Sequence, residues 1–119
     1  MQILVCGGRD YRDTKFICDI LDSYLNDYPH SLSIIEGGAS GADHIAFQWA
    51  TRNNVPVTTV HADWKRFGKS AGPNRNQQMI DMKPDVVLAF PSGTSRGTYD
   101  TINRATHADI LTYVYAPRS

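Results

Sequence analysis

Glycine, small hydroxyl and arginine residues are concentrated in four short segments of this sequence. The segments are GGRD at 7–10, GGASGAD at 37–43, HADWKRFGKSAGPNRN at 61–76 and PSGTSRGT at 91–98. Glycine lets the backbone approach a phosphate closely, free amides at a helix start donate hydrogen bonds to it, and arginine offers a planar fork to its oxygens. The mixture predicts binding of a phosphorylated ligand. None of these segments is a Walker A or GxGxxG motif, so the sequence motifs do not indicate ATP hydrolysis or dinucleotide binding.

Other side chains near these segments could contact a sugar, a base or a reacting atom. Asp10 and Asp43 could bind the hydroxyls of a ribose or act as acid and base, whereas Asp43 could instead only stabilise the first turn of a helix. Trp64 could stack on a base or cover a sheet edge. The predicted ligand-binding residues are Gly7, Gly8, Arg9, Asp10, Gly37, Gly38, Ser40, Gly41, Asp43, Trp64, Arg75, Asn76, Pro91, Ser92, Gly93, Arg96, Gly97 and Thr98.

The histidines and cysteines do not suggest a metal or redox site. His44, His61 and His107 lack the spacing of metal ligands and are interpreted as surface or core residues. Cys6 and Cys18 form no CxxC or Cys/His pair and are interpreted as reduced thiols. No cofactor is evident, and magnesium is expected only where a phosphate ligand brings it.

The pattern of apolar residues predicts alternating strands and helices that would position these segments. Such alternation is typical of a mostly parallel sheet with helices on both faces, in which ligands bind outside the carboxyl ends of the strands. Each glycine segment follows an expected strand and therefore belongs at that edge. We expect strands over 2–6, 32–35, 55–60, 85–90 and 110–114, helices over 16–28, 40–50, 74–82 and 95–106, and an irregular stretch over 61–73.

Composition and charge limit the classes of protein. The 119 residues suit one domain over 1–119, and 41% of them are hydrophobic, as in ordinary globular proteins. Twelve basic and twelve acidic side chains cancel, so nucleic-acid binding would need a local patch. No apolar run is long enough for a membrane span and no signal peptide is apparent, so we expect a cytosolic protein without a membrane partner.

The chain resembles the SLOG superfamily of Rossmann-like proteins, which includes the Smf DNA-processing proteins and the LONELY GUY phosphoribohydrolases. It is most similar to the small YspA-like branch. The matching blocks are GGRDY at 7–11, EGGASGADHIAFQWA at 36–50, ADWKRFGKSAGPNRNQQM at 62–79 and AFPSGTSRGTYDTINRA at 89–105. The resemblance implies a Rossmann-like three-layer sandwich with a five-stranded sheet.

Two branches of this superfamily suggest different activities. The GGASGAD segment resembles the loop that holds single-stranded DNA phosphates in the DNA-processing branch, implying contacts from Gly37, Gly38, Ser40, Gly41 and Asp43. The segments RNQQM at 75–79 and PSGTSRGTYD at 91–100 resemble elements of the phosphoribohydrolase branch. Enzymes of that branch cleave the N-glycosidic bond of a nucleoside monophosphate with an arginine and a glutamate, and they are dimers, which implies a homodimer here.

The match to the phosphoribohydrolase elements is incomplete. Arg75 corresponds to the arginine, but Thr101 stands where the family has glutamate, and the nearby acid is Asp100. A glycosidase needs a carboxylate, so Arg75 and Asp100 are the candidate catalytic residues of such an enzyme. Other SLOG domains are inferred sensors of nucleotide signals, including ADP-ribose derivatives, in conflicts between bacteria and phages.

Three functions therefore follow from the sequence. The leading hypothesis is binding of a nucleotide or a nucleotide-derived signal, of the ADP-ribose or cyclic nucleotide type, without turnover. The second is N-glycosidic hydrolysis of a nucleoside monophosphate or an ADP-ribose-like compound, so the sequence leaves open whether the chain is an enzyme. The third is single-stranded nucleic-acid binding through the glycine loop and the strip Trp64, Lys65, Arg66 and Lys69, against which the zero formal charge argues.

Overall fold

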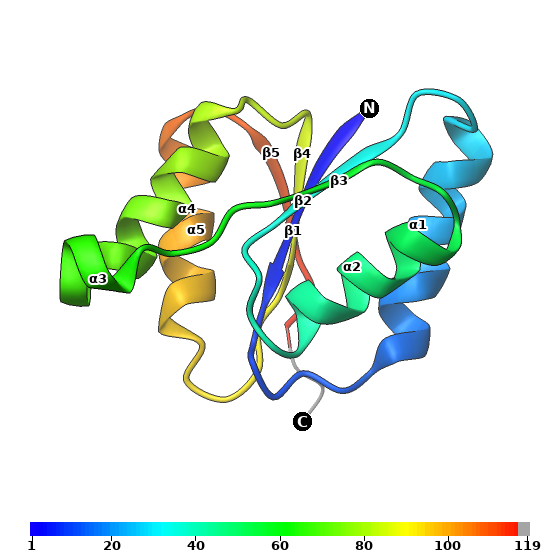
Figure 1. The fold of residues 1–119 in the computed structure, drawn as a ribbon. Coiled ribbons are helices and arrows are strands. Elements are labelled where there is room, and N and C mark those ends of the chain that lie inside the picture. The colour runs from blue at the N-terminus through cyan, green and yellow to red at the C-terminus, as the bar shows by residue number, and fades with distance from the viewer. Residues whose placement is uncertain (117–119) are drawn as a thin grey trace.

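The computed structural model describes residues 1–116 and has a five-stranded sheet at its centre (Figure 1). All four neighbouring strand pairs are parallel, and the strand order is β3-β2-β1-β4-β5. The predicted parallel α/β fold is confirmed. The strands are β1 (Gln2–Gly7), β2 (Ser33–Glu36), β3 (Val57–Thr59), β4 (Val86–Phe90) and β5 (Leu111–Val114).

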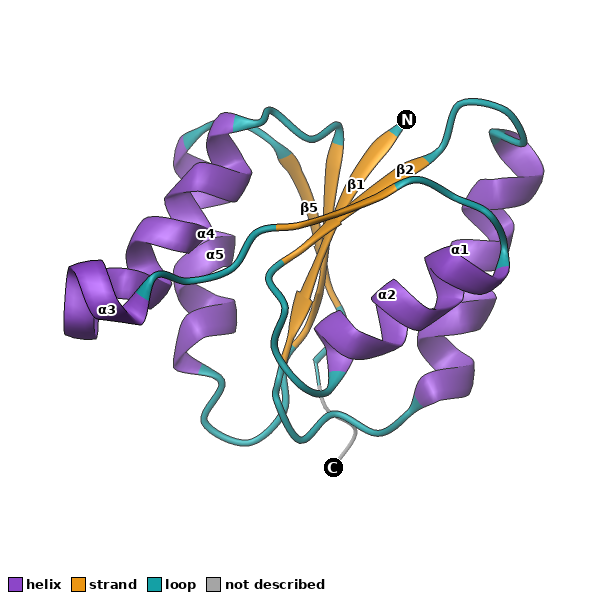
Figure 2. Cartoon of the chain, viewed as in Figure 1, coloured by secondary structure: helices purple, strands orange, loops and turns teal. Residues whose placement is uncertain are grey.

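Helices cover both faces of this sheet and complete a three-layer sandwich (Figure 2). Helices α1 (Thr14–Asp27) and α2 (Ala42–Arg52) lie on one face, and α4 (Ala71–Asp81) and α5 (Arg96–His107) lie on the other. Because the chain runs outward from β1 to β3 and then returns to β4 beside β1, the strand order reverses between β1 and β4. Such a reversal opens a crevice at the carboxyl ends of the strands. No helix within residues 1–116 is long and apolar enough to cross a bilayer.

Alternating side chains of the central strands build a core on each face of the sheet. Ile3 and Val5 pack in the cluster that contains residues of α1 and α2, including Trp49. Leu4 and Cys6 pack on the opposite side, in the cluster that contains residues of α4 and α5. Strands buried on both faces need a continuous apolar run, which explains sequences such as VVLAF in β4.

The expected irregular stretch over 61–73 is wrong for most of its length. It contains α3 (Trp64–Phe67) and the 3₁₀-helix η1 (Gly68–Ser70), and α4 begins at Ala71 rather than at 74. The Asp63 side chain caps α3 by accepting a hydrogen bond from the Arg66 N–H at 3.2 Å. Pro73 lies in the first turn of α4, where its missing N–H costs little. The proline is therefore part of a helix start rather than the end of a loop.

Candidate functional site

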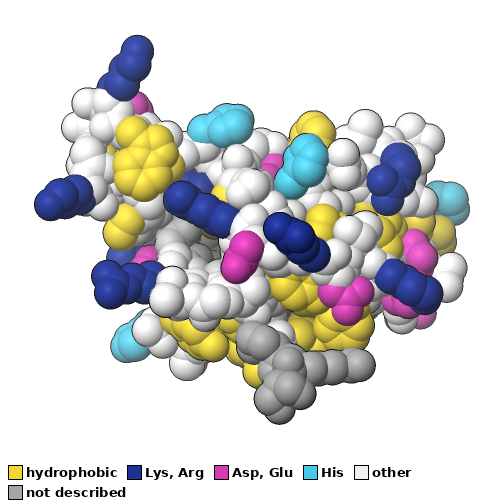
Figure 3. All heavy atoms as spheres, turned by 90° about the horizontal axis from the view of Figure 1, so that it is seen from below, with side chains coloured by type: hydrophobic (Ala, Val, Ile, Leu, Met, Phe, Trp, Pro, Cys, Tyr) yellow, Lys and Arg dark blue, Asp and Glu magenta, His cyan; other side chains and the backbone are white. Residues whose placement is uncertain are grey.

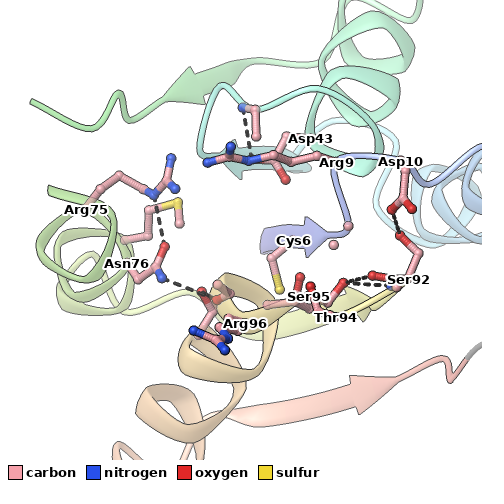
Figure 4. A pocket seen from close by; sticks show the side chains of 18 residues that line it. Cys6, Arg9, Asp10, Asp43, Arg75, Asn76, Ser92, Thr94, Ser95 and Arg96 are labelled. Carbon is pink, nitrogen blue, oxygen red and sulfur yellow. Dashed lines mark hydrogen bonds between the residues drawn. The ribbon is translucent and has the colours of Figure 1, made fainter. Parts of the chain in front are cut away.

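A cavity of about 550 Å³ lies at the carboxyl edge of the sheet, beside β1 and β4 (Figure 4). Residues after β1, the loop before α2, helix α4 and the loop leading into α5 all contribute to its wall. Figure 3 shows this edge of the molecule from below, with basic side chains and histidines spread over it and acidic and apolar side chains among them. The lining residues are Cys6, Gly7, Gly8, Arg9, Asp10, Ala39, Asp43, Arg75, Asn76, Met79, Ser92, Gly93, Thr94, Ser95, Arg96, Gly97, Thr98 and Thr101.

Three arginines from different elements line this cavity. Arg9 follows β1, Arg75 belongs to α4, and Arg96 begins α5. The Arg75 guanidinium donates to the Gly37 carbonyl, and its Nε donates to the Asn76 side chain at 2.9 Å, so its position is fixed by the protein. Arg9 and Arg96 are exposed and lie on opposite sides of the cavity in Figure 4. The fold therefore brings the sequence-predicted arginines to one place.

The loop after β4 presents the start of α5 to the cavity. The Ser95 hydroxyl accepts a hydrogen bond from the Ser92 N–H at 2.7 Å and donates to the Ser92 carbonyl, which closes the loop. The Tyr99 N–H donates to the Ser95 carbonyl at 3.1 Å, which begins the hydrogen-bond pattern of the helix. The N–H groups before it in the first turn therefore have no acceptor within the helix. Since the helix dipole is positive here, this end of the cavity favours an anion.

One of the predicted phosphate-loop glycines, Gly97, faces open space, whereas others are needed for packing. A side chain at Gly97 would meet no atom within 4 Å, so the cavity is open there. A side chain at Gly41 would collide with the Gly8 carbonyl, and one at Gly8 would collide with the Ser92 hydroxyl. Gly8 and Gly41 thus allow three loops to meet at the edge of the sheet.

Asp43 is the buried carboxylate of the site. Its Oδ2 accepts hydrogen bonds from the Gly37 N–H at 3.0 Å and the Ala39 N–H at 3.3 Å, which shapes the glycine loop. Burial raises the pKa of Asp43 to about 6, and the nearby Glu36 charge adds to the rise, while the two backbone hydrogen bonds oppose it. Asp43 therefore titrates in the range where a carboxyl can act as an acid or a base.

Asp10 differs from Asp43 because it is exposed. Its Oδ1 accepts a hydrogen bond from the Ser92 hydroxyl at 2.5 Å. This hydrogen bond lowers the pKa of Asp10 below its ordinary value. Asp10 thus lines the cavity as a charged carboxylate that ties the loop after β1 to the loop after β4.

Asp100 lies outside the cavity lining, whereas Thr101 is part of it. The Asp100 carboxylate accepts hydrogen bonds from Arg104 Nε at 2.8 Å and from Asn76 Nδ2 at 3.0 Å. Although burial raises the pKa of Asp100, these two hydrogen bonds outweigh it and the pKa falls. The Thr101 hydroxyl donates to the Gly97 carbonyl at 3.1 Å. Position 101, which the resemblance aligns with the glutamate of the phosphoribohydrolases, therefore carries a neutral hydroxyl.

Several predicted binding residues contribute from behind the cavity wall or lie elsewhere. The Ser40 hydroxyl donates to the Arg9 carbonyl at 3.1 Å and so supports the loop that carries Arg9. Trp64 is 54% exposed on α3, away from the cavity lining. The other predicted residues that do not line this cavity are Gly37, Gly38, Gly41 and Pro91.

Sequence reasoning missed some of the lining. Thr94 and Ser95 belong to the segment PSGTSRGT, whose hydroxyl content was a usable signal. Cys6 and Met79 were indistinguishable from ordinary core residues, and both are nearly fully buried. Burial raises the pKa of Cys6 far above its ordinary value, so its thiol is not a nucleophile at neutral pH.

The strand order, the helices on both faces and the crevice at the strand ends define a Rossmann-like α/β domain. A family model described as YAcAr, the YspA, cpYpsA-related SLOG family, matches residues 1–67. The chain belongs to this family.

Two known proteins are similar to the chain. The "Gene 61 protein" of Mycobacterium phage D29 is 39% identical over 114 residues, which cover 92% of this chain and 91% of the relative. The X-ray structure of DNA processing protein A (DprA) from Streptococcus pneumoniae matches 99% of this chain with a TM-score of 0.76 and 20% identity. The chain spans about half the length of that DprA chain, and this likeness shows the fold alone.

Proposed function

We propose that the chain binds a nucleotide or a nucleotide-derived phosphorylated ligand in the 550 Å³ cavity. The observation that carries the proposal is the convergence of Arg9, Arg75, Arg96 and the first turn of α5 on one cavity. Guanidinium groups and free backbone amides at a helix start are the donors that proteins use for phosphate oxygens. A cavity of this size is in the range that accommodates small-molecule ligands.

The carboxylates of the site favour binding over hydrolysis. A glycosidase needs a carboxylate at the sugar carbon, yet Asp100 is hydrogen bonded to Arg104 and Asn76, and Thr101 is neutral. One observation supports hydrolysis as the second candidate: Asp43 lines the cavity and has a pKa of about 6. In that reaction Arg75 would orient the phosphate and Asp43 would supply the carboxylate.

Thermal unfolding with a panel of ligands tests the proposal. The panel comprises nucleoside monophosphates, cyclic and linear dinucleotides, NAD and ADP-ribose, each with and without Mg²⁺. A ligand present at about 100 times its dissociation constant should stabilise the protein by about 2.7 kcal/mol. Chromatography with mass detection of each stabilising mixture then separates the two candidates. An intact ligand supports binding alone, and a free base with a ribose phosphate supports hydrolysis.

Matched arginine variants localise the effect. Arg96→Gln should weaken binding of the stabilising ligand by about tenfold, because it removes a charged donor from the cavity. Arg52→Gln is the control, since Arg52 is exposed near the end of α2 and does not line the cavity. Equal affinities of the two variants, or no stabilisation by any ligand of the panel, would contradict the proposal.

A further inference from the structure

A second cavity of about 240 Å³ adjoins the first one across the loop between β2 and α2. Ala39 lines both cavities, so they lie on either side of this loop. The remaining lining residues come from the end of β2, the same loop, helix α2, the end of β3 and the loop after it. They are Glu36, Gly38, His44, Phe47, Thr59 and His61.

The charge of this second cavity is opposite to that of the first. No lysine or arginine lines it, and its one carboxylate, Glu36, is 1% exposed. Glu36 Oε1 accepts from the Gly38 N–H at 2.7 Å, and Oε2 accepts from the Thr59 hydroxyl. Neither ion pair found within residues 1–116 involves Glu36. Both carboxylate oxygens of Glu36 thus already have protein donors, and a carboxylate in the wall disfavours a phosphate in this cavity.

Aromatic rings line the sides of this cavity. Phe47 is 40% exposed although it is a large apolar residue, and His44 lies one helical turn before it on α2. His61 lies against Gly38, where a Cβ atom would come within 2.8 Å of its Nδ1. No group of three or more potential metal ligands occurs within residues 1–116, so the histidines and Glu36 do not assemble a metal site. Rings of this kind suit a planar group.

We propose that the second cavity is the base subsite of the ligand whose phosphates bind among the three arginines. The planar base would lie against Phe47 and the imidazoles. The ligand would pass Ala39, which belongs to both cavities. This inference rests on the proposed function and narrows its ligands to phosphorylated compounds that carry such a base.

The experiment compares ligands with and without a base. The probes are AMP, GMP, CMP and ADP-ribose, with ribose 5-phosphate as the probe that lacks a base. We expect the wild-type chain to bind at least one base-bearing probe about tenfold more tightly than ribose 5-phosphate, because stacking on an aromatic residue contributes to affinity. Phe47→Ala should remove most of this difference and leave the affinity for ribose 5-phosphate unchanged. Isothermal titration calorimetry measures all of these affinities.

Two further variants make the test specific. Tyr28→Ala also removes an exposed aromatic residue, but Tyr28 follows the last turn of α1 and lines neither cavity, so binding should not change. His61→Ala should weaken only the base-bearing probes. Circular dichroism spectra that match the wild type establish that each variant is folded.

The failure of this inference differs from the failure of the proposed function. If no probe binds the wild-type chain and no ligand of the thermal-unfolding panel stabilises it, both are wrong. If a panel ligand stabilises the chain but none of these base-bearing probes binds it, the base subsite alone is wrong. If ribose 5-phosphate and the base-bearing probes bind with equal affinity, or if Phe47→Ala and His61→Ala preserve the difference between them, the phosphate site stands and the base subsite is wrong.

Discussion

At the scale of single residues, the site depends on a buried carboxylate that positions a backbone loop. Asp43 accepts two N–H groups of the loop that separates the two cavities, and Arg75 donates to the Gly37 carbonyl of the same loop. Charged groups in this region therefore set the position of uncharged backbone atoms. The carboxylate carries a cost, because burial favours its neutral form.

The pH dependence of stability measures that cost. The pKa of Asp43 in the folded chain, about 6, exceeds its ordinary value of 3.8. A carboxyl whose pKa is raised by folding contributes its full stabilisation below the pKa of the unfolded chain. This contribution is lost as the pH rises through the pKa of the folded chain. Between pH 4 and pH 7, wild-type stability should therefore fall relative to Asp43→Asn by up to about 3 kcal/mol. Urea unfolding at each pH measures the difference, and parallel profiles would contradict the assignment.

Individual residues also show how much of the site the sequence could predict. Arg9 and Arg96 were predictable because each follows an expected strand, and Arg75 because it was expected near the start of a helix. The carboxyl ends of parallel strands meet at one edge of the sheet. The side on which a helical residue lies was harder to predict. Asp100 and Thr101 are adjacent on α5, yet only Thr101 lines the cavity, because about 100° of helix rotation separates them.

At the scale of elements, helix starts carry much of the site. Helix α5 begins at the cavity with Arg96, Gly97 and Thr98, while α4 contributes Arg75 and Asn76 from inside its length. The five strands were predicted to within about two residues at each end, because buried parallel strands are continuous apolar runs. The helices near 64–73 were missed because their starts depend on a side-chain cap by Asp63 and a tolerated proline.

Substitution of Gly97 should have opposite effects on stability and binding. Alanine favours a helix over glycine by up to about 1 kcal/mol, and a methyl group at position 97 would contact nothing in the protein. Gly97→Ala should thus raise the midpoint of thermal unfolding. The same methyl group would enter the space of a phosphate at the start of α5, so we expect ligand affinity to fall on the order of tenfold.

Gly72→Ala is the matched control for this substitution. Gly72 lies in the first turn of α4, outside the cavity, where a Cβ atom would make only an ordinary contact with Trp64 at 3.7 Å. It should raise stability without changing ligand affinity, as measured by calorimetry. A Gly97→Ala variant that binds the ligand as tightly as Gly72→Ala would show that α5 does not hold the phosphate.

At the scale of the whole molecule, charge is balanced overall and concentrated locally. Acidic and basic side chains are equal in number, while one cavity carries three arginines with Asp10 and Asp43, and its neighbour carries the buried Glu36 without a lysine or arginine. The electrostatic field of the whole molecule therefore provides little long-range attraction for a polyanion. Under the proposed function, recognition of a small ligand would depend instead on groups within contact distance. This distribution favours a compact phosphorylated ligand over a long nucleic-acid strand.

Binding of single-stranded DNA tests this conclusion, because α3 carries an exposed Trp64 beside Lys65 and Arg66. With Lys69, the basic residues near it could neutralise about three phosphates, which gives a slope of about −2 for log affinity against log salt concentration. We expect a fluorescent oligothymidylate to bind with a dissociation constant of about 10⁻⁴ M or weaker at physiological salt. Trp64→Ala should leave nucleotide affinity unchanged. Fluorescence anisotropy across a salt series measures the dissociation constant of the oligothymidylate and its salt dependence. Submicromolar binding that Trp64→Ala abolishes would make α3 a nucleic-acid interface instead.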